Sequence, residues 1–257
     1  NALYRSGFPA FHNAGSAYVA PYAYYGGYMS GLYENEYAGQ HMFNTHMNNL
    51  DVQSGADNGE LVRLWFNTYD AITKRANFTI KGIPRTPGLS DADKNRLMAE
   101  AKFFRALNYF TLVKMFGAIP IISEPVEDLK GDIYPGRSSV ELVYKFIEQD
   151  LLDALDGGLN DKSMAYNEGR VSKGSVLALL SDVYLNMAGA PINDKSKYAE
   201  AAKYAEMVMD NSAYALIQNK DKGENSAYNI IRTSDKETEY LYYYEFLSTI
   251  ANAGWYP

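Results

Sequence analysis

The chain contains no cysteine among its 257 residues, so neither a disulfide framework nor thiolate chemistry is available to it. It also has no apolar run long enough to span a membrane as a helix, and no segment typical of a signal peptide. Positive charge is in short supply, because 24 lysines and arginines stand against 31 aspartates and glutamates and leave a net charge of −7. That balance argues against a nucleic-acid-binding protein, which needs a basic surface.

Side chains suited to catalysis or metal binding are equally sparse. The three histidines are His12, His41 and His46. The last two are five residues apart with no acid between them, so they do not form the His-Glu-x-x-His pattern of helical zinc sites. Asp150 and Asp153 resemble an acid–base pair of carboxylates, but we place them on a solvated helix face, where most acidic side chains lie. The sequence thus predicts no enzyme activity, no metal site and no cofactor.

Tyrosine is unusually abundant in the chain. Hydrophobic residues make up 47 % of the chain, enough for one large domain or two small ones, and 23 residues are tyrosine. A tyrosine fills a helix interface, or it offers a ligand a flat ring with a hydrogen-bonding edge. Both uses have to be considered for each of them.

A long helix is predicted between Ser90 and Gly117. Ser90 and Asp93 form a capping-box-like start, with acids at the positive end of the helix dipole, and Gly117 supplies a left-handed stop. Apolar residues recur at helical spacing: Leu97, Ala101, Phe104, Leu107, Leu112 and Met115. Ala101 and Ala106 are small, so a neighbouring helix can approach this one closely.

Further helices are predicted on both sides of the long one. Apolar stripes or capping boxes mark Glu60–Ile80, Ser138–Gly157, Val176–Ala188 and Tyr198–Asp210. Residues 1–59 lack sustained periodicity, and a first helix is expected within Ala14–Glu36. Trp65 lies on the apolar stripe of its helix and is assigned to the core. The last two helices resemble a tetratricopeptide repeat, in which small residues let antiparallel helices nest. One such repeat cannot bury its own apolar face, so the hairpins are expected to stack.

The carboxy-terminal part has a different pattern. Helical periodicity fades beyond Tyr214, and Glu239–Phe246 has the alternation of a β-strand. The predicted fold is therefore mainly α, with helical hairpins stacked as tetratricopeptide-like repeats, irregular loops and a short β element near the C-terminus.

Two segments resemble the signatures of a known family. The first is Glu100-Ala101-Lys102-Phe103-Phe104-Arg105-Ala106, followed by Tyr109-Phe110 and by Phe116-Gly117-Ala118-Ile119-Pro120. The second is Gly169-Arg170-Val171-Ser172-Lys173, followed by Leu177–Leu180 and Val183-Tyr184-Leu185. Both are similar to segments of SusD/RagB-type proteins. A third set of residues resembles the first repeat helix of that family: Trp65, Tyr69, Ile72 and Asn77.

The resemblance implies a surface lipoprotein of Bacteroidetes that captures a nutrient for an outer-membrane transporter. The implied ligand is an oligosaccharide, and the implied partner is a SusC-like TonB-dependent transporter at the extracellular face of the outer membrane. The lipid anchor is not in this chain, so we expect an internal or amino-terminal fragment forming a single domain over 1–257. Its expected parts are loop-rich residues 1–59, repeat helices at 60–212 and the start of a loop-rich part at 213–257. A peptide-binding RagB-like protein and a pure protein-interaction scaffold remain as alternatives.

Loops that combine aromatic and polar side chains are the candidate ligand contacts. A sugar gains from burying its C–H face on an aromatic ring, while its hydroxyls must keep hydrogen bonds when water leaves. Two loops offer that mixture, and their candidate residues are Tyr37, His41, Phe43, Asn44, His46, Trp255 and Tyr256. Packing of these rings against other parts of the protein is the alternative for each one.

Overall fold

The computed structural model describes residues 2–7, 30, 59–125, 128–129, 135–234 and 237–243. They fall into two compact units that divide between Ala71 and Ile72. The first unit contains η1 (Leu3–Arg5) and α3 (Gly59–Asp70), and the second contains the elements from α4 onward.

The helix predicted over Glu60–Ile80 is present but interrupted. α3 runs into a π-helical turn, η5 (Ala71–Ala76), and then into α4 (Asn77–Gly82), before η6 (Ile83–Arg85) ends the run at a proline. Within α3, the Trp65 ring stacks on Tyr69 with 5.2 Å between ring centroids. Trp65 is only partly buried, so its assignment to the core was wrong, whereas Leu64 is fully buried.

The long predicted helix is α5 (Asp91–Phe116), and both of its ends form as expected. The Ser90 hydroxyl accepts a hydrogen bond of 3.1 Å from the Asp93 backbone N–H. At the other end Gly117 has a φ of 67°, a conformation that glycine adopts without steric cost. The predicted apolar stripe underestimated how much of the helix is buried, because every residue of 99–113 except Lys102 is buried. α5 is therefore the central rod of its unit.

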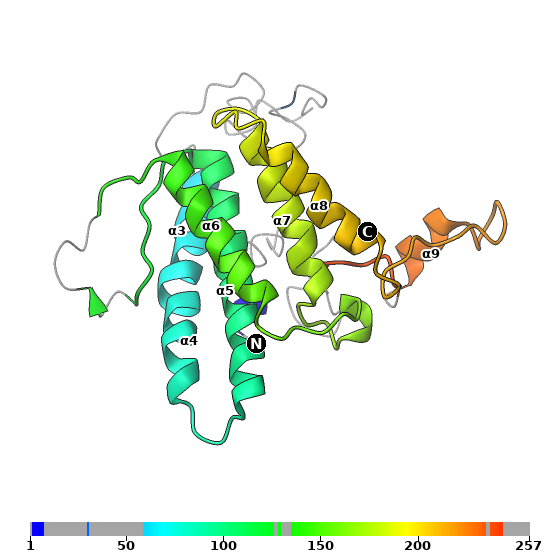
Figure 1. Ribbon diagram of the computed structural model, residues 1–257, viewed down its shortest axis with the longest axis horizontal. Helices are drawn as coiled ribbons and strands as arrows, with labels where there is room; N and C mark the ends of the chain where they lie inside the picture. Colours follow the sequence, from blue (N-terminus) through cyan, green and yellow to red (C-terminus); the bar gives the residue numbers. More distant parts are fainter. Residues whose placement is uncertain are drawn as a thin grey trace. The chain divides into compact units, whose positions relative to one another are not determined.

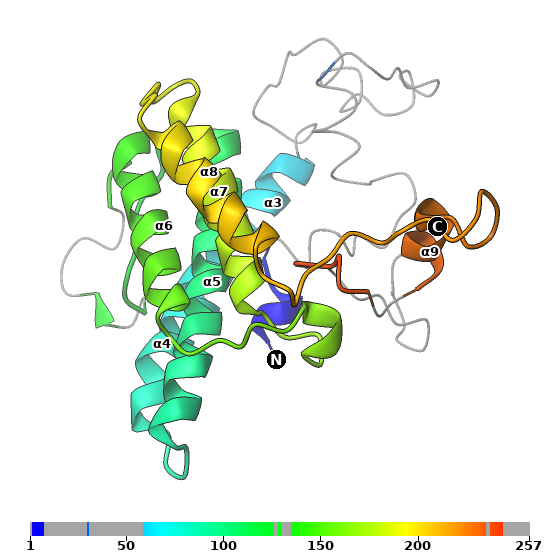
Figure 2. The same cartoon turned by 45° about the vertical axis from the view of Figure 1, so that its right-hand side comes forward.

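Each of the following helices packs against its neighbours in the chain: α6 (Val140–Leu155), α7 (Lys173–Ala188) and α8 (Lys197–Met209). Figures 1 and 2 show α5 beside α6 and α7 beside α8. α5 and α6 run antiparallel, since Lys102 pairs with Asp153 at one level and the Tyr109 ring meets Phe146 at another. The predicted stack of helical hairpins is confirmed.

The helix starts differ slightly from the prediction. The N-cap of α6 is Ser139 rather than Ser138, and its hydroxyl accepts from the Leu142 N–H at 3.4 Å. α7 begins at Lys173, three residues earlier than Val176, because Ser172 and Ser175 form a reciprocal capping box. Ser138 instead forms an isolated antiparallel bridge with Ile119.

One glycine marks the closest approach of α6 to α5. A Cβ on Gly157 would lie 2.5 Å from the Cβ of Ala99 and 3.1 Å from the Asn95 carbonyl oxygen. Glycine is therefore needed here for packing. Small residues on α5 have the expected role, because Ala101 and Ala106 are fully buried.

The predicted β-strand at Glu239–Phe246 is absent from its described part, residues 239–243. These residues are held by the helical unit instead of by another strand. The Ser175 hydroxyl donates to the Leu241 carbonyl at 2.6 Å, and the Tyr242 ring lies 5.3 Å from Phe103. Three short helices were not predicted, η1, η8 (Met164–Tyr166) and α9 (Ala227–Thr233), because three or seven residues are too few to show a period.

Candidate functional site

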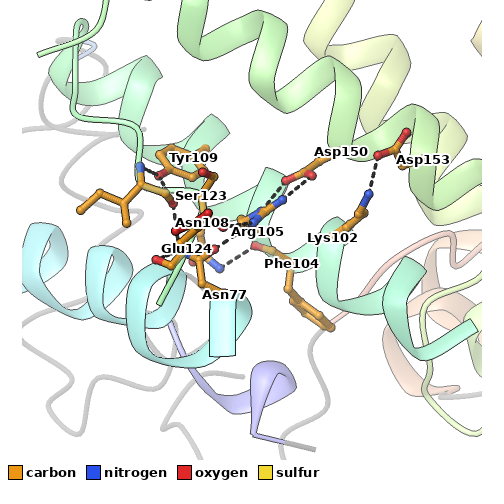
Figure 3. Close-up of polar contacts among 11 residues, drawn as sticks. Asn77, Lys102, Phe104, Arg105, Asn108, Tyr109, Ser123, Glu124, Asp150 and Asp153 are labelled. Atoms are coloured by element: carbon orange, nitrogen blue, oxygen red, sulfur yellow. Dashed lines mark hydrogen bonds and ion pairs between the residues drawn. The ribbon is translucent and has the colours of Figure 1, made fainter. Parts of the chain in front are cut away.

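A buried charged cluster joins four segments around Arg105 of α5 (Figure 3). Its guanidinium donates to both carboxylate oxygens of Asp150 on α6, from Nε and from NH2, each at 2.7 Å. NH1 donates to the Asn77 side-chain oxygen at 2.9 Å and to the Ser123 carbonyl at 3.1 Å. Asn77 in turn donates to the Ile122 and Glu124 carbonyls, both at 2.9 Å.

This cluster is a structural joint, because its charged groups are buried and hydrogen-bonded to one another. Asp150 is 3 % exposed, so its placement on a solvated helix face was wrong. Burial raises the pKa of the Asp150 carboxyl, and the Arg105 guanidinium opposes that shift. The carboxylate and guanidinium satisfy each other in the interior, so Asp150 is paired with Arg105 and not with Asp153.

A polar pocket of about 340 Å³ lies between α5 and the segment 159–171 that leads into α7. α5 contributes Arg96 and Glu100 to its wall, and Leu159 and Val171 contribute buried apolar surface. The remaining lining side chains are polar or aromatic: Asn160, Lys162, Tyr166, Asn167, Glu168 and Arg170. This volume is near the lower end of the range for small-ligand sites, roughly 300–1,000 Å³.

The charged wall of the pocket is fixed by Glu100. Arg170 approaches its carboxylate in a two-point contact, from Nε to Oε1 at 3.0 Å and from NH2 to Oε2 at 2.6 Å. Arg96 donates to Oε1 at 3.4 Å and to Asp93 Oδ1 at 3.0 Å. Glu100 belongs to the first signature segment and Arg170 to the second, so this ion pair joins the two segments that carry the family resemblance.

The opposite wall is held in place by two asparagines. Asn160 Nδ2 donates to Asn167 Oδ1 at 2.6 Å, and Asn167 Nδ2 donates to the Arg170 and Val171 carbonyls at 3.0 and 3.2 Å. Glu168, next to Asn167, has a φ of 56° and thus a left-handed backbone. Sequence reasoning had not identified this pocket, and the only signal for it was that two signature segments contribute to it.

All seven predicted ligand residues lie outside the described residues: Tyr37, His41, Phe43, Asn44, His46, Trp255 and Tyr256. The histidine at position 12 and the first predicted helix, Ala14–Glu36, apart from Ser30, also lie outside them. In the described part of the chain, no group of three or more His, Asp and Glu side chains could hold a metal ion. None of the described helices has the length and apolar character needed to cross a membrane.

The family model described as SusD-like, starch-binding associating with outer membrane, matches residues 16–185. This match covers most of the chain and includes both signature segments. The chain belongs to the SusD-like family. The family assignment predicted from the two signatures is thereby confirmed.

Two relatives illustrate how the SusD-like chain compares in sequence. SusD-like protein P2 of Formosa agariphila is 28 % identical over 204 residues, which are 78 % of this chain and 37 % of the relative. The starch-binding protein SusD of Bacteroides thetaiotaomicron is 31 % identical over 137 residues, 53 % of this chain and 23 % of the relative. The chain thus spans well under half the length of the relatives it matches.

Solved structures of the family share the helical architecture. A SusD superfamily protein from Parabacteroides distasonis aligns over 75 % of this chain and 39 % of its own, with a TM-score of 0.64 and 34 % identity. A laminarin-binding SusD-like protein covers 85 % of this chain and 43 % of its own, with a TM-score of 0.61 and 27 % identity. A structure with xylogluco-oligosaccharide covers 68 % and 34 %, with a TM-score of 0.56 and 26 % identity.

Proposed function

We propose that this SusD-like chain is a non-catalytic glycan-binding protein that captures an oligosaccharide at the outer-membrane surface. The observation that carries the proposal is the family match over residues 16–185, in a family described as starch-binding and associated with the outer membrane. The relatives named for starch, laminarin and xylogluco-oligosaccharide support a glucan as the ligand class.

The helical stack acts in this proposal as a rigid mount for capture loops. α5 is buried over residues 99–113 except at Lys102, and it is joined to α6 through Arg105 and Asp150. A rigid mount favours binding because less conformational freedom is lost when the ligand arrives. The capture residues we propose are those of the two aromatic loops: Tyr37, His41, Phe43, Asn44, His46, Trp255 and Tyr256.

The proposed partner is a SusC-like TonB-dependent transporter, to which the captured glycan is handed over. The proposed location is the extracellular face of the outer membrane, through a lipid anchor. Both follow from the family assignment alone.

Affinity electrophoresis of the chain in gels that contain starch, laminarin or xyloglucan tests the proposal. We expect at least one of these neutral glucans to retard the protein, and Trp255→Ala to reduce the retardation. Tyr228→Ala is the matched control, because Tyr228 is an aromatic residue of α9 whose side chain is largely exposed. Unretarded migration in all three gels, together with binding to a peptide mixture, would overturn the proposal in favour of peptide capture.

A further inference from the structure

We propose that the polar pocket between α5 and residues 159–171 is a second carbohydrate subsite, which takes one neutral sugar residue. This goes beyond the proposed function, which places glycan capture on two other loops. Some polar groups of the pocket are hydrogen-bonded within the protein, and others are exposed where a ligand could reach them.

The buried charge of the pocket is internally compensated. The Glu100 carboxylate is 4 % exposed and accepts three hydrogen bonds, two from Arg170 and one from Arg96. Arg96 is shared further with Asp93. A charged ligand would therefore have to compete with existing ion pairs that are partly desolvated, and an uncharged ligand would leave them intact.

The pocket offers a ligand one positively charged and one negatively charged side chain. Among the described residues, neither the Lys162 ammonium nor the Glu168 carboxylate has a hydrogen-bond or ion-pair partner; both residues line the pocket and are exposed to solvent. An ammonium only donates hydrogen bonds and a carboxylate only accepts them. A hydroxyl does both, so a polyhydroxylated ligand can satisfy the two groups at once. A uronate, phosphate or sulfate would gain from Lys162 but would be repelled by Glu168.

An aromatic residue completes the composition that favours a sugar. Tyr166 lines the pocket and is 55 % exposed, and an aromatic ring in such a position suits the C–H face of a pyranose. Val171 is buried at the base of the same wall. Apolar surface beside mixed donors and acceptors distinguishes a sugar from an ion or a small polar metabolite.

The pocket is also built before any ligand arrives. The two-point contact between Arg170 and Glu100 ties the segment 159–171 to α5, and the hydrogen bonds of Asn167 with Asn160 and the Arg170 carbonyl hold that segment together. Side chains that are already ordered bind a weakly held ligand, such as a single sugar residue, better than mobile side chains do. The reason is that their conformational entropy was lost in folding and is not lost again on binding.

Nuclear magnetic resonance of the ¹⁵N-labelled chain tests the subsite directly. The side-chain amide signals of Asn160 and Asn167 are assigned with Asn160→Asp and Asn167→Asp, and laminarihexaose, maltoheptaose and trigalacturonate are then titrated in turn. We expect saturable shifts of these signals with a neutral oligosaccharide and none with trigalacturonate. Absence of shifts with both neutral oligosaccharides would overturn the subsite.

Two variants separate recognition from a structural role. Tyr166→Ala is expected to weaken the binding measured at these amide signals about fivefold or more, while Tyr198→Ala, at an exposed tyrosine of α8, leaves it unchanged. Glu168→Asn retains a residue that tolerates positive φ and removes the carboxylate. It should therefore allow saturable shifts of the amide signals with trigalacturonate, and their continued absence would contradict the role given to Glu168.

The indole N–H signal of Trp255 separates this proposal from the proposed function. If Trp255 responds to a neutral oligosaccharide and the Asn160 and Asn167 amides do not, the subsite is refuted and loop capture stands. If the amides respond and Trp255 does not, the subsite stands and the loop assignment fails. If none of these signals responds to either neutral oligosaccharide, both proposals are overturned.

Discussion

The guanidinium of Arg105 and the carboxylate of Asp150 meet in two parallel hydrogen bonds of 2.7 Å inside the helical unit (Figure 3). The two residues are 45 positions apart in the chain and lie on the antiparallel helices α5 and α6. Because both side chains are buried, each depends on the other to offset the loss of water. The ion pair therefore fixes the register of the two helices around which the other elements of the unit are built.

Breaking this pair on one side should destabilise the chain strongly. We expect Arg105→Met to lower the free energy of unfolding by about 3–5 kcal/mol, because Asp150 is left as an uncompensated buried charge. The double variant Arg105→Met with Asp150→Leu should recover much of that loss, since no charge then remains in the interior. Urea denaturation at neutral pH measures both.

The matched control is the exposed pair of Lys203 and Glu200, whose N···O distance is 3.4 Å. Lys203→Ala should cost less than about 1 kcal/mol, as surface ion pairs do. A loss for Arg105→Met as small as that for Lys203→Ala would contradict the structural role of the buried pair.

The Arg105–Asp150 pair also shows what the sequence could and could not predict. Periodicity and capping residues located α5 and α6 to within a few residues, because those signals are local in the chain. Which charges lie inside depends on partners far away in sequence, so Asp150 was assigned to a solvated face. Trp65 was misplaced for the same reason, since its apolar character does not say how much of it the tertiary structure covers.

The close approach at Gly157 makes a second prediction. Gly157→Ala should lower the free energy of unfolding by about 1–3 kcal/mol, because its Cβ would lie 2.5 Å from the Cβ of Ala99. The loss in the double variant with Ala99→Gly should be smaller than the sum of the two single losses. Gly82→Ala is the control, since a Cβ there has no heavy atom within 4 Å and φ is −78°. Equal effects of the two glycine substitutions would rule out close packing at Gly157.

The stability of the folded chain at alkaline pH should depend on Tyr144. Burial, assisted by the nearby charge of Asp182, raises the pKa of Tyr144 to about 12. Above about pH 10 the unfolded chain releases this proton while the folded chain keeps it, so folding stability falls as pH rises from about 10 toward 12. Tyr144→Phe removes that contribution and should make the decline shallower by a fraction of the roughly 1.4 kcal/mol per pH unit that one proton carries.

Denaturant unfolding at about pH 8 and about pH 10.5 measures this effect. Tyr228→Phe, which removes a hydroxyl from a largely exposed ring, is the control and should follow the wild-type decline. A Tyr144→Phe chain that loses stability as steeply as the wild type would show that Tyr144 is not protected by burial.

The candidate sites were predictable to different degrees. The signature residues Glu100 and Arg170 were recognised as parts of a family pattern, but their ion pair and the pocket beside it required the fold, because 70 residues separate them. The residues around Tyr242 were read as a strand because alternation is a local signal, whereas their contacts with Phe103 and Ser175 are not local. The aromatic loops near Tyr37 and Trp255 remain predictions.

Calorimetric titration of the chain with laminarihexaose and maltoheptaose, followed by chromatography of the recovered sugar, tests non-catalytic glycan capture most directly. The account predicts saturable heat with at least one of the two and recovery of that oligosaccharide at its original length. Shortened oligosaccharides after incubation, or no binding heat with either ligand, would contradict it.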